Sequence, residues 1–252
     1  MSANNWRTHN PSGSKRVVAT KDLPGYRWLK ILAGADCRVD IGTSTDILSI
    51  EEIKEAIGNK CDGVIGQLTE KWGEELFSAL KAAGGKAYSN YAVGYDNVDV
   101  PVATKNGIPV GNTPGVLTET TAEMAVALTL AASRRVPEAD VYMRGGKYKG
   151  WLPSLFLGEL LNRKTVGIVG AGRIGYVYAR MMVEGFKMNL VYFDLYQNKA
   201  LEEYIAAYGE FLQSRGEEPV TRTPFDVGVQ YMEFTEAVTR SAQTGQAISL
   251  PL

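Results

Sequence analysis

Three glycines in the second half of the chain have the spacing of a phosphate-binding turn. They are Gly170, Gly172 and Gly175, and they follow the β-rich run Thr165–Val169. In such a turn the first glycine permits the sharp bend, the second lets backbone N–H groups approach a diphosphate, and the third lets the next helix pack on the strand. The diphosphate then lies at the positive end of that helix. The spacing alone also occurs in ordinary glycine-rich turns, so the flanking residues decide between the two.

A helix and an acidic residue follow the turn, as a dinucleotide site requires. The helical pattern places Ile174, Val177, Tyr178 and Met181 on one face. A second strand ends at Asp194, about 20 residues past the last glycine. A carboxylate there can accept hydrogen bonds from the adenosine ribose and would repel a 2′-phosphate, which favours NAD over NADP. The predicted cofactor-binding residues are Gly170, Gly172, Arg173, Ile174, Gly175 and Asp194.

A second candidate loop lies in the first half of the chain. Residues 92–94 (Ala-Val-Gly) follow a predicted strand at 86–90. A glycine-containing turn after a strand leaves N–H groups free, and a small anion fits them. From the residues alone, an ordinary strand-to-helix loop capped by Asp96 or Asn97 is the favoured interpretation.

The side chains that other chemistries need are scarce. The 252 residues include one histidine, His9, and two cysteines, Cys37 and Cys61. This composition excludes a metal site built on paired histidines and offers neither a disulfide framework nor a zinc cluster, so no metal is predicted. His9 lies in a polar stretch before the first predicted strand, so we expect it at the surface rather than in a Ser–His–Asp or Cys–His site.

Charge and hydropathy exclude further classes. With 27 basic and 28 acidic side chains the net charge is −1, which gives no electrostatic basis for binding nucleic acid or an anionic membrane. The longest apolar run, 122–132, is about half the length that a bilayer requires. The start lacks the apolar stretch of a secretory signal, and the end reads SLPL rather than the peroxisomal S-K-L. A soluble, cytosolic chain is predicted.

Strand and helix alternate through the first 115 residues. The helix at 49–59 begins with Ser49 as N-cap and Glu52 at the capping-box position, and the helix at 70–85 ends at two glycines. Alternation of this kind predicts an α/β fold with a parallel sheet that is covered on both faces. The predicted strands are 16–20, 37–42, 61–67, 86–90 and 108–113.

One long helix is predicted at 118–135, where Thr120 and Glu123 have capping-box spacing. Its middle is apolar nearly all round, so several sides must be covered. It fits a junction between two domains or two subunits, or a core helix of one domain. After Asp194 an amphipathic helix is predicted. Its inward residues are Leu201, Tyr204, Ile205, Tyr208, Phe211 and Leu212.

Several segments together resemble the D-2-hydroxyacid dehydrogenases. They are NYAVGYDNVDV (90–100), GNTPGVLTETTAE (111–123), VGIVGAGRIG (166–175) and VYFDLYQ (191–197). Two more, 61–87 and 143–153, bring the chain closer to the plant-type hydroxypyruvate reductases within that family. The resemblance extends from about Lys15 to about Pro219.

The resemblance implies an α/β fold of two domains with parallel sheets. They are a flavodoxin-like substrate domain at 15–115 and a Rossmann NAD-binding domain at 116–224, followed by an unassigned tail at 225–252. The Rossmann domain is incomplete, because the sequence supplies two clear strands where about six are usual. The resemblance also implies a homodimer built through the cofactor domains, with a peroxisomal, photorespiratory role in the full-length plant relatives.

The activity implied is NADH-dependent reduction of hydroxypyruvate to D-glycerate, with glyoxylate as a second substrate. Backbone N–H groups of Val93 and Gly94 would bind the substrate carboxylate. Thr121 matches a position near the nicotinamide, although first-turn helix polarity explains it nearly as well.

No catalytic residue is assigned. The family's arginine, glutamate and histidine lie beyond the point where the resemblance ends, and no family pattern follows 223–226. Two alternatives therefore stay open: an active reductase, or a catalytically silent form that binds NAD or pairs with full-length subunits. For the chain alone we expect no turnover above background.

Overall fold

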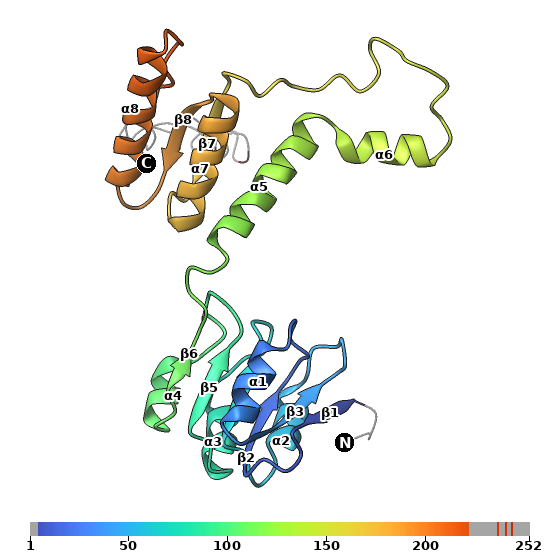
Figure 1. The fold of residues 1–252 in the computed structure, drawn as a ribbon, viewed down its shortest axis with the longest axis vertical. Coiled ribbons are helices and arrows are strands. Elements are labelled where there is room, and N and C mark those ends of the chain that lie inside the picture. Colours follow the sequence, from blue (N-terminus) through green and yellow to red (C-terminus); the bar gives the residue numbers. More distant parts are fainter. Residues whose placement is uncertain (1–4, 222–235, 237–239, 241–242, 244–252) are drawn as a thin grey trace. The chain divides into compact units, whose positions relative to one another are not determined.

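The computed structural model describes residues 5–221 together with Glu236, Arg240 and Gln243. The chain divides into two compact units between Val116 and Leu117, beside the predicted domain boundary (Figure 1). Apart from those three residues, the predicted tail at 225–252 lies outside the described part of the chain. We describe each unit by itself.

The first unit is built on a sheet whose described strands have the order β1-β3-β2-β4-β5-β6. From β2 to β6 all pairings are parallel, and β1 pairs with β3 in antiparallel fashion. Without β1, the order in chain terms is 2-1-3-4-5, which confirms the predicted flavodoxin-like arrangement. The strands are β1 (Trp6–His9), β2 (Lys15–Ala19), β3 (Cys37–Gly42), β4 (Gly63–Gly66), β5 (Ala87–Asn90) and β6 (Val110–Gly111).

The edge strand β1 and the position of His9 were not predicted. His9 is half-buried in β1 and is paired with Val39 of β3, so placing it before the first strand is wrong. The segment is short and polar and carries little strand signal of its own. Main-chain pairing with β3 forms it, together with a hydrogen bond from Thr8 Oγ1 to Asp40 Oδ1 at 2.8 Å.

Four helices are described in the first unit. Ser49 caps α2 as predicted: its Oγ accepts from the Glu52 N–H at 3.2 Å, and the Glu52 carboxylate accepts from the Ser49 N–H at 2.8 Å. The third helix begins at Glu74 rather than at residue 70, because Trp72 is buried and its N–H donates to the Asn97 carbonyl at 2.8 Å. The helices are α1 (Arg27–Gly34), α2 (Ile50–Ile57), α3 (Glu74–Ala82) and α4 (Val100–Lys105).

The two faces of the sheet are covered differently. One face packs against α2 and α3 in a core that includes Ile53, Phe77 and Tyr88. On the other face Leu29 of α1 packs against Val39 and its neighbours. Beside α1 an apolar groove of about 580 Å³ runs over β4, β5 and β6. The described residues therefore leave part of this face open, whereas the sequence predicted cover on both faces.

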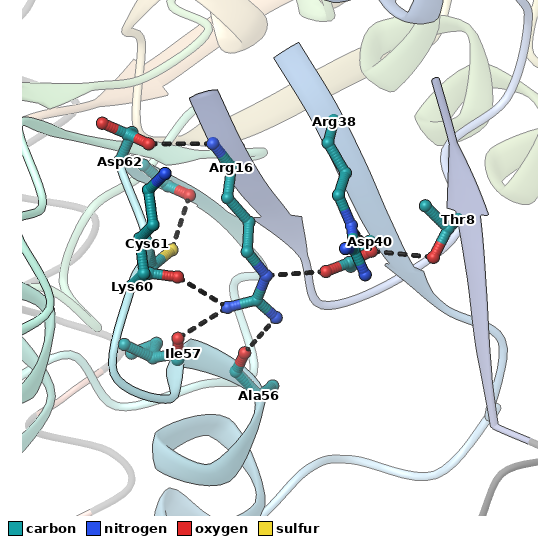
Figure 2. A network of polar contacts seen from close by, with 10 residues as sticks. Thr8, Arg16, Arg38, Asp40, Ala56, Ile57, Lys60, Cys61 and Asp62 are labelled. Atoms are coloured by element: carbon teal, nitrogen blue, oxygen red, sulfur yellow. Dashed lines mark hydrogen bonds and ion pairs between the residues drawn. The ribbon is translucent and has the colours of Figure 1, made fainter. Parts of the chain in front are cut away.

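Arg16 ties β2 to the end of α2 (Figure 2). Its guanidinium donates to the carbonyl oxygens of Ala56 at 2.8 Å, Ile57 at 2.7 Å and Lys60 at 2.9 Å. A cation at the C-terminal end of a helix satisfies carbonyls that have no partner inside the helix and complements the helix dipole.

The same guanidinium pairs with Asp40 of β3, Nε to Oδ2, at 2.7 Å (Figure 2). Thr8 and Arg38 also donate to this carboxylate, at 2.8 and 3.0 Å. Burial alone would raise the pKa of the Asp40 carboxyl, but the hydrogen bonds from Arg16, Thr8 and Arg38 outweigh burial and hold the pKa below its ordinary value. The side chain of Asp40 is thus a charged link between three strands.

The second unit contains a parallel pair of described strands with helices around it. Its core includes Ile168, Met182, Tyr192 and Ile205. The strands are β7 (Thr165–Val169) and β8 (Asn189–Phe193), and the helices are α5 (Thr118–Ser133), α6 (Val136–Arg144), α7 (Arg173–Phe186) and α8 (Lys199–Ser214).

The predicted helix at 118–135 begins at Thr118 as expected, but it ends at Ser133, and its predicted capping box is wrong. Arg135 adopts a left-handed φ of 54°, and a separate helix, α6, follows it with a proline in its first turn. At the start, Leu117 is the N-cap, and the hydroxyl of Thr120 donates to the Leu117 carbonyl at 3.2 Å instead of capping the helix. Within α5 only Ala122 is buried, so the described residues do not supply the expected cover.

The inward face of α7 is Ala179, Met182 and Val183, not the face predicted from the sequence. The helix is apolar on two sides because it packs on the strands and also on α5. Tyr178 of the predicted face turns to α5, where its hydroxyl lies 2.8 Å from Thr129 Oγ1. In α8 the predicted Leu201, Ile205 and Leu212 are buried, whereas Tyr204 and Tyr208 are half-buried and Phe211 is 52% exposed.

Candidate functional site

The geometry of the turn between β7 and α7 requires glycine at two of its three glycine positions, Gly170 and Gly175. Gly170 has a φ of +93°, a left-handed conformation that side chains disfavour. A Cβ on Gly175 would lie 2.1 Å from the Gly170 carbonyl oxygen, so only glycine lets the helix approach the strand this closely. A Cβ on Gly172 would meet nothing within 4 Å, which leaves open space in front of the turn.

The N-terminus of α7 presents free N–H groups to that space. The first hydrogen bond of the helix runs from the Tyr176 N–H to the Gly172 carbonyl at 2.8 Å. The N–H groups of Arg173, Ile174 and Gly175 therefore have no acceptor inside the helix, and Gly172 provides no side-chain cap. Because these groups lie at the positive end of the helix dipole, the turn can bind a phosphate or diphosphate.

Asp194 follows β8 and is tied to the turn. Its Oδ2 accepts from the Ala171 N–H at 2.7 Å, and its Oδ1 accepts from the Leu195 N–H at 2.7 Å. A carboxylate has about four acceptor positions, so it can still accept ribose hydroxyl groups. The structure thus brings the acid predicted from its spacing into direct contact with the glycine turn.

Asn198 is a second partner of the turn that sequence analysis missed. Its Nδ2 donates to the Ala171 carbonyl at 2.6 Å, while its Oδ1 accepts from the Leu201 N–H at 3.0 Å as the N-cap of α8. The cap could have been found from the sequence, since asparagine is a preferred N-cap residue. The contact with Ala171 could not, because the two residues are 27 positions apart.

Thr121 lies in the first turn of α5, where its hydroxyl donates to the Leu117 carbonyl at 2.7 Å. This is the contact expected of a polar residue in the first turn of a helix. Further along, the bond between Thr129 and Tyr178 joins α5 to α7, so the helix that carries Thr121 is fixed to the helix that begins at the glycine turn. A role for Thr121 near the nicotinamide stays a prediction.

The loop at 92–94 in the first unit is held through all three of its carbonyls. In chain order they accept from the Thr113 N–H at 2.9 Å, from Asn112 Nδ2 at 2.9 Å and from Asn90 Nδ2 at 3.0 Å. The contacts with Asn112 and Asn90 were not predicted, because side-chain contacts of this kind are set by the fold rather than by spacing.

These contacts direct the N–H groups of the loop. In a trans peptide the N–H of one residue points opposite to the carbonyl of the residue before it. The N–H groups of Val93 and Gly94 therefore point away from Thr113 and Asn112. Within the described part of the chain neither N–H has an acceptor, and Gly94 is exposed. Two adjacent free N–H groups are suited to a small carboxylate.

A buried polar network fixes the orientation of Asn90, which has no exposed surface. The Tyr88 hydroxyl donates to Asn90 Oδ1 at 3.0 Å, so the Asn90 amide turns its nitrogen toward the Gly94 carbonyl. Burial, and then the nearby charge of Glu70, raise the pKa of Tyr88, which keeps this hydroxyl protonated as a donor.

The predicted caps Asp96 and Asn97 are wrong. Asp99 caps α4 by accepting from the Val102 N–H at 3.0 Å. Asn97 instead donates to the Glu70 carbonyl at 2.8 Å and belongs to the network behind the loop. The cap lies at Asp99 because α4 begins only at Val100.

Two further properties hold for the described residues. They contain no group of three or more His, Cys, Asp or Glu side chains that could hold a metal ion. None of their helices has the length and apolar character needed to cross a bilayer.

Comparison with known families defines the class of protein. Residues 26–248 match the family described as D-isomer specific 2-hydroxyacid dehydrogenase, catalytic domain. The chain therefore belongs to that family, which confirms the resemblance seen in the sequence motifs. The matched range continues beyond Pro219, the predicted end of the resemblance.

Individual relatives refine this assignment. The chain is 66% identical over 213 residues to the glycerate dehydrogenase of Cucumis sativus, covering 84% of this chain and 56% of the relative. It is 65% identical over 214 residues to the peroxisomal glycerate dehydrogenase HPR of Arabidopsis thaliana, covering 84% and 55%. A glyoxylate reductase of Korarchaeum cryptofilum is 42% identical over 191 residues, covering 75% and 55%. The chain thus spans little more than half the length of these relatives.

A solved structure agrees with the fold. The crystal structure of the TT0316 protein from Thermus thermophilus superimposes with a TM-score of 0.69 at 36% identity. The superposition covers 73% of this chain and 57% of that protein.

Proposed function

We propose that the chain binds NADH at the glycine turn and belongs to an enzyme that reduces hydroxypyruvate, and also glyoxylate, to D-2-hydroxy acids. The observation that carries the proposal is the turn itself. Its N–H groups at the start of α7 are free, and the space before Gly172 is open. The names of the relatives, glycerate dehydrogenase and glyoxylate reductase, support the choice of substrates.

The cofactor-binding residues have distinct roles in this proposal. Gly170 shapes the turn, and Gly175 permits the close approach of α7. The N–H groups of Gly172, Arg173 and Ile174 hold the diphosphate. Asp194 accepts the ribose hydroxyl groups, and Thr121 lies near the nicotinamide. Bound NADH supplies the hydride, and the chain's own residues bind and orient the cofactor.

The N–H groups of Val93 and Gly94 bind the carboxylate of the keto acid. Their carbonyl neighbours are fixed by Thr113 and Asn112, so the loop is organised before the substrate arrives. An anion site that needs no rearrangement spends none of its binding free energy on ordering the loop.

A second candidate function is a form that binds NADH without turnover. Hydride transfer to a ketone leaves an alkoxide, which needs a proton donor that works near neutral pH. The only histidine of the sequence, His9, is held half-buried in β1 by pairing with β3. This observation is the basis for keeping the silent form as the alternative.

One assay separates the two functions. The purified chain is mixed with NADH and hydroxypyruvate, and the loss of NADH absorbance is followed while NADH binding is measured by calorimetry. Turnover near the typical value of about 10 per second supports the reductase. Binding without turnover supports the silent form, and the absence of both contradicts the proposal.

We further infer a homodimer through the second unit. Its helices and the segment after α6 expose large apolar side chains: Leu128 at 62%, Val141 at 69%, Trp151 at 79% and Leu157 at 67%. Exposed apolar surface of this extent marks interaction sites. Sedimentation should give a dimer that Leu128→Lys weakens and that Leu68→Lys, an exposed site in the first unit, does not.

Location is a separate question. The Arabidopsis relative is named as peroxisomal, which supports a peroxisomal location as the alternative to the cytosol. Imaging of the fluorescently labelled full chain distinguishes the two compartments.

A further inference from the structure

In the glycine turn, side chains hold both the backbone N–H and the backbone carbonyl of one residue, Ala171. Ala171 lies between the exposed Gly170 and Gly172 and is itself buried. Its N–H donates to Asp194 at 2.7 Å, and its carbonyl accepts from Asn198 Nδ2 at 2.6 Å. The turn is therefore clamped at its centre, although its flanking glycines have wide conformational freedom.

The clamp on the Ala171 carbonyl sets the direction of the next N–H. Across a planar trans peptide, the Gly172 N–H points opposite to the Ala171 carbonyl. Because Asn198 draws that carbonyl to one side, the Gly172 N–H is turned to the other. Gly172 has no side chain whose packing could fix this peptide, and among the described residues the hydrogen bond from Asn198 is the one side-chain contact that acts directly on its carbonyl.

Asn198 is itself anchored in the core of the second unit. Its backbone N–H donates to the Tyr192 hydroxyl at 3.0 Å, and that hydroxyl donates to Glu202 Oε1 at 2.8 Å. Tyr192 and Glu202 are 1% and 7% exposed. The Oδ1 of Asn198 is occupied by the Leu201 N–H as the cap of α8. The amide therefore has one orientation, with oxygen toward the helix and nitrogen toward the turn.

We propose that Asn198 is a positioning residue that aims the Gly172 N–H at the diphosphate of the cofactor. The inference rests on the proposed NADH site and deepens it. Asparagine suits this place because a single side chain must accept from the helix and donate to the turn at the same time. A serine could cap the helix equally well, but its shorter side chain could not also reach the Ala171 carbonyl.

The test compares Asn198→Ser with Asn198→Ala in the full chain. Thermal unfolding and the dissociation constants of NADH, ADP and adenosine are measured for each variant. Asn198→Ser keeps the cap and should unfold only slightly below the wild type, yet bind NADH and ADP about threefold to tenfold more weakly, the range of one lost hydrogen bond. Adenosine, which has no phosphate, should bind both proteins equally. Asn198→Ala should lose the cap as well and unfold at a lower temperature.

A matched control removes a helix cap elsewhere. Ser49→Ala deletes the N-cap of α2 in the first unit and should lower stability without changing the affinity for NADH. Asn198→Ser binding ADP as tightly as the wild type would overturn the inference and leave the NADH site standing. Equal weakening of ADP and adenosine would show a general loss of the site and would also overturn it. A wild-type chain that binds no NADH would refute the proposed function itself.

Discussion

The two loops proposed to bind anions are organised in a similar way but in different surroundings. In each, hydrogen bonds from side chains, and in the loop at 92–94 also from the Thr113 N–H, hold backbone carbonyls from behind so that the neighbouring N–H groups face outward. In the loop at 92–94 three successive carbonyls are held, and the network behind them is buried, with Asn90 at 0% and Tyr88 at 1% exposed. In the glycine turn only Ala171 is held, and the glycines on either side are exposed.

The two loops are held differently because only the glycine turn is followed directly by a long helix. The loop at 92–94 has no long helix behind it, so its N–H groups gain their direction entirely from hydrogen bonds to the core. The glycine turn begins α7, a helix of 14 residues whose free N–H groups and dipole already attract an anion. We therefore expect substitutions that disturb the loop at 92–94 to lower the stability of the first unit as well. Anion binding at the glycine turn should depend instead on the close packing at Gly175.

The largest effect is expected where the packing of the turn is broken. Gly175→Ala places a Cβ 2.1 Å from the Gly170 carbonyl, and the clash should cost about 3 kcal/mol of unfolding free energy and abolish NADH binding. Urea unfolding and calorimetry measure the two effects.

Gly185→Ala is the matched control in the same helix. A Cβ there meets nothing within 4 Å, and replacing a glycine inside a helix should stabilise the protein by about 0.5 to 1 kcal/mol. If Gly175→Ala bound NADH normally, the role of close packing at the turn would be wrong.

The next effect tests the charged link in the first unit. Asp40→Asn removes the carboxylate that accepts from Arg16, and it should cost about 3 kcal/mol near neutral pH because a partly buried guanidinium loses its partner. The control Asp22→Asn breaks an exposed pair with Arg7 and should cost at most about 0.5 kcal/mol.

The pH dependence of this link has a definite sign. The pKa of Asp40 is lower in the folded protein than in the unfolded chain, so its contribution is fully present above about pH 5 and is lost as the pH falls through the folded pKa. Asp40→Asn should therefore lose less stability than the wild type between neutral and acidic pH. Parallel losses in the two proteins would contradict the lowered pKa.

The smallest expected effect tests whether a side-chain hydrogen bond organises the loop at 92–94. Asn112→Ala removes the donor to the Val93 carbonyl, and it should cost about 1 kcal/mol and weaken binding of hydroxypyruvate several-fold. Amide NMR shifts of Val93 and Gly94 report that binding. Asn106→Ala, which removes a similar bond to the Val102 carbonyl at 3.0 Å, should lose comparable stability with no change in binding. An identical affinity in both variants would show that Asn112 does not organise the loop.

The sequence predicted those features that depend on local pattern. The capping box of Ser49 and Glu52 and the alternation of strand and helix rest on residues close in the chain, whereas the flavodoxin-like strand order was implied by the family resemblance. The glycine turn belongs to this group, because the positive φ of Gly170 and the close approach at Gly175 are steric demands that glycine meets.

The features that could not be predicted depend on distant partners. Strand β1 exists through its pairing with β3, and the face of α7 is set by contact with α5 as well as with the strands. The roles of Asn198 and Asn112 rest on single hydrogen bonds across 27 and 19 positions. Spacing carries no signal for such contacts, because any asparagine in a loop or cap has the same local pattern.

An amide NMR titration of the full chain with NADH tests the central claim most directly. The account predicts that the resonances of Gly172, Arg173 and Ile174 shift first and saturate together, while those of Val93 and Gly94 stay in place until hydroxypyruvate is added. If NADH left the amides of the glycine turn unmoved, or moved only residues elsewhere, the turn would not be a diphosphate site and the account would be wrong.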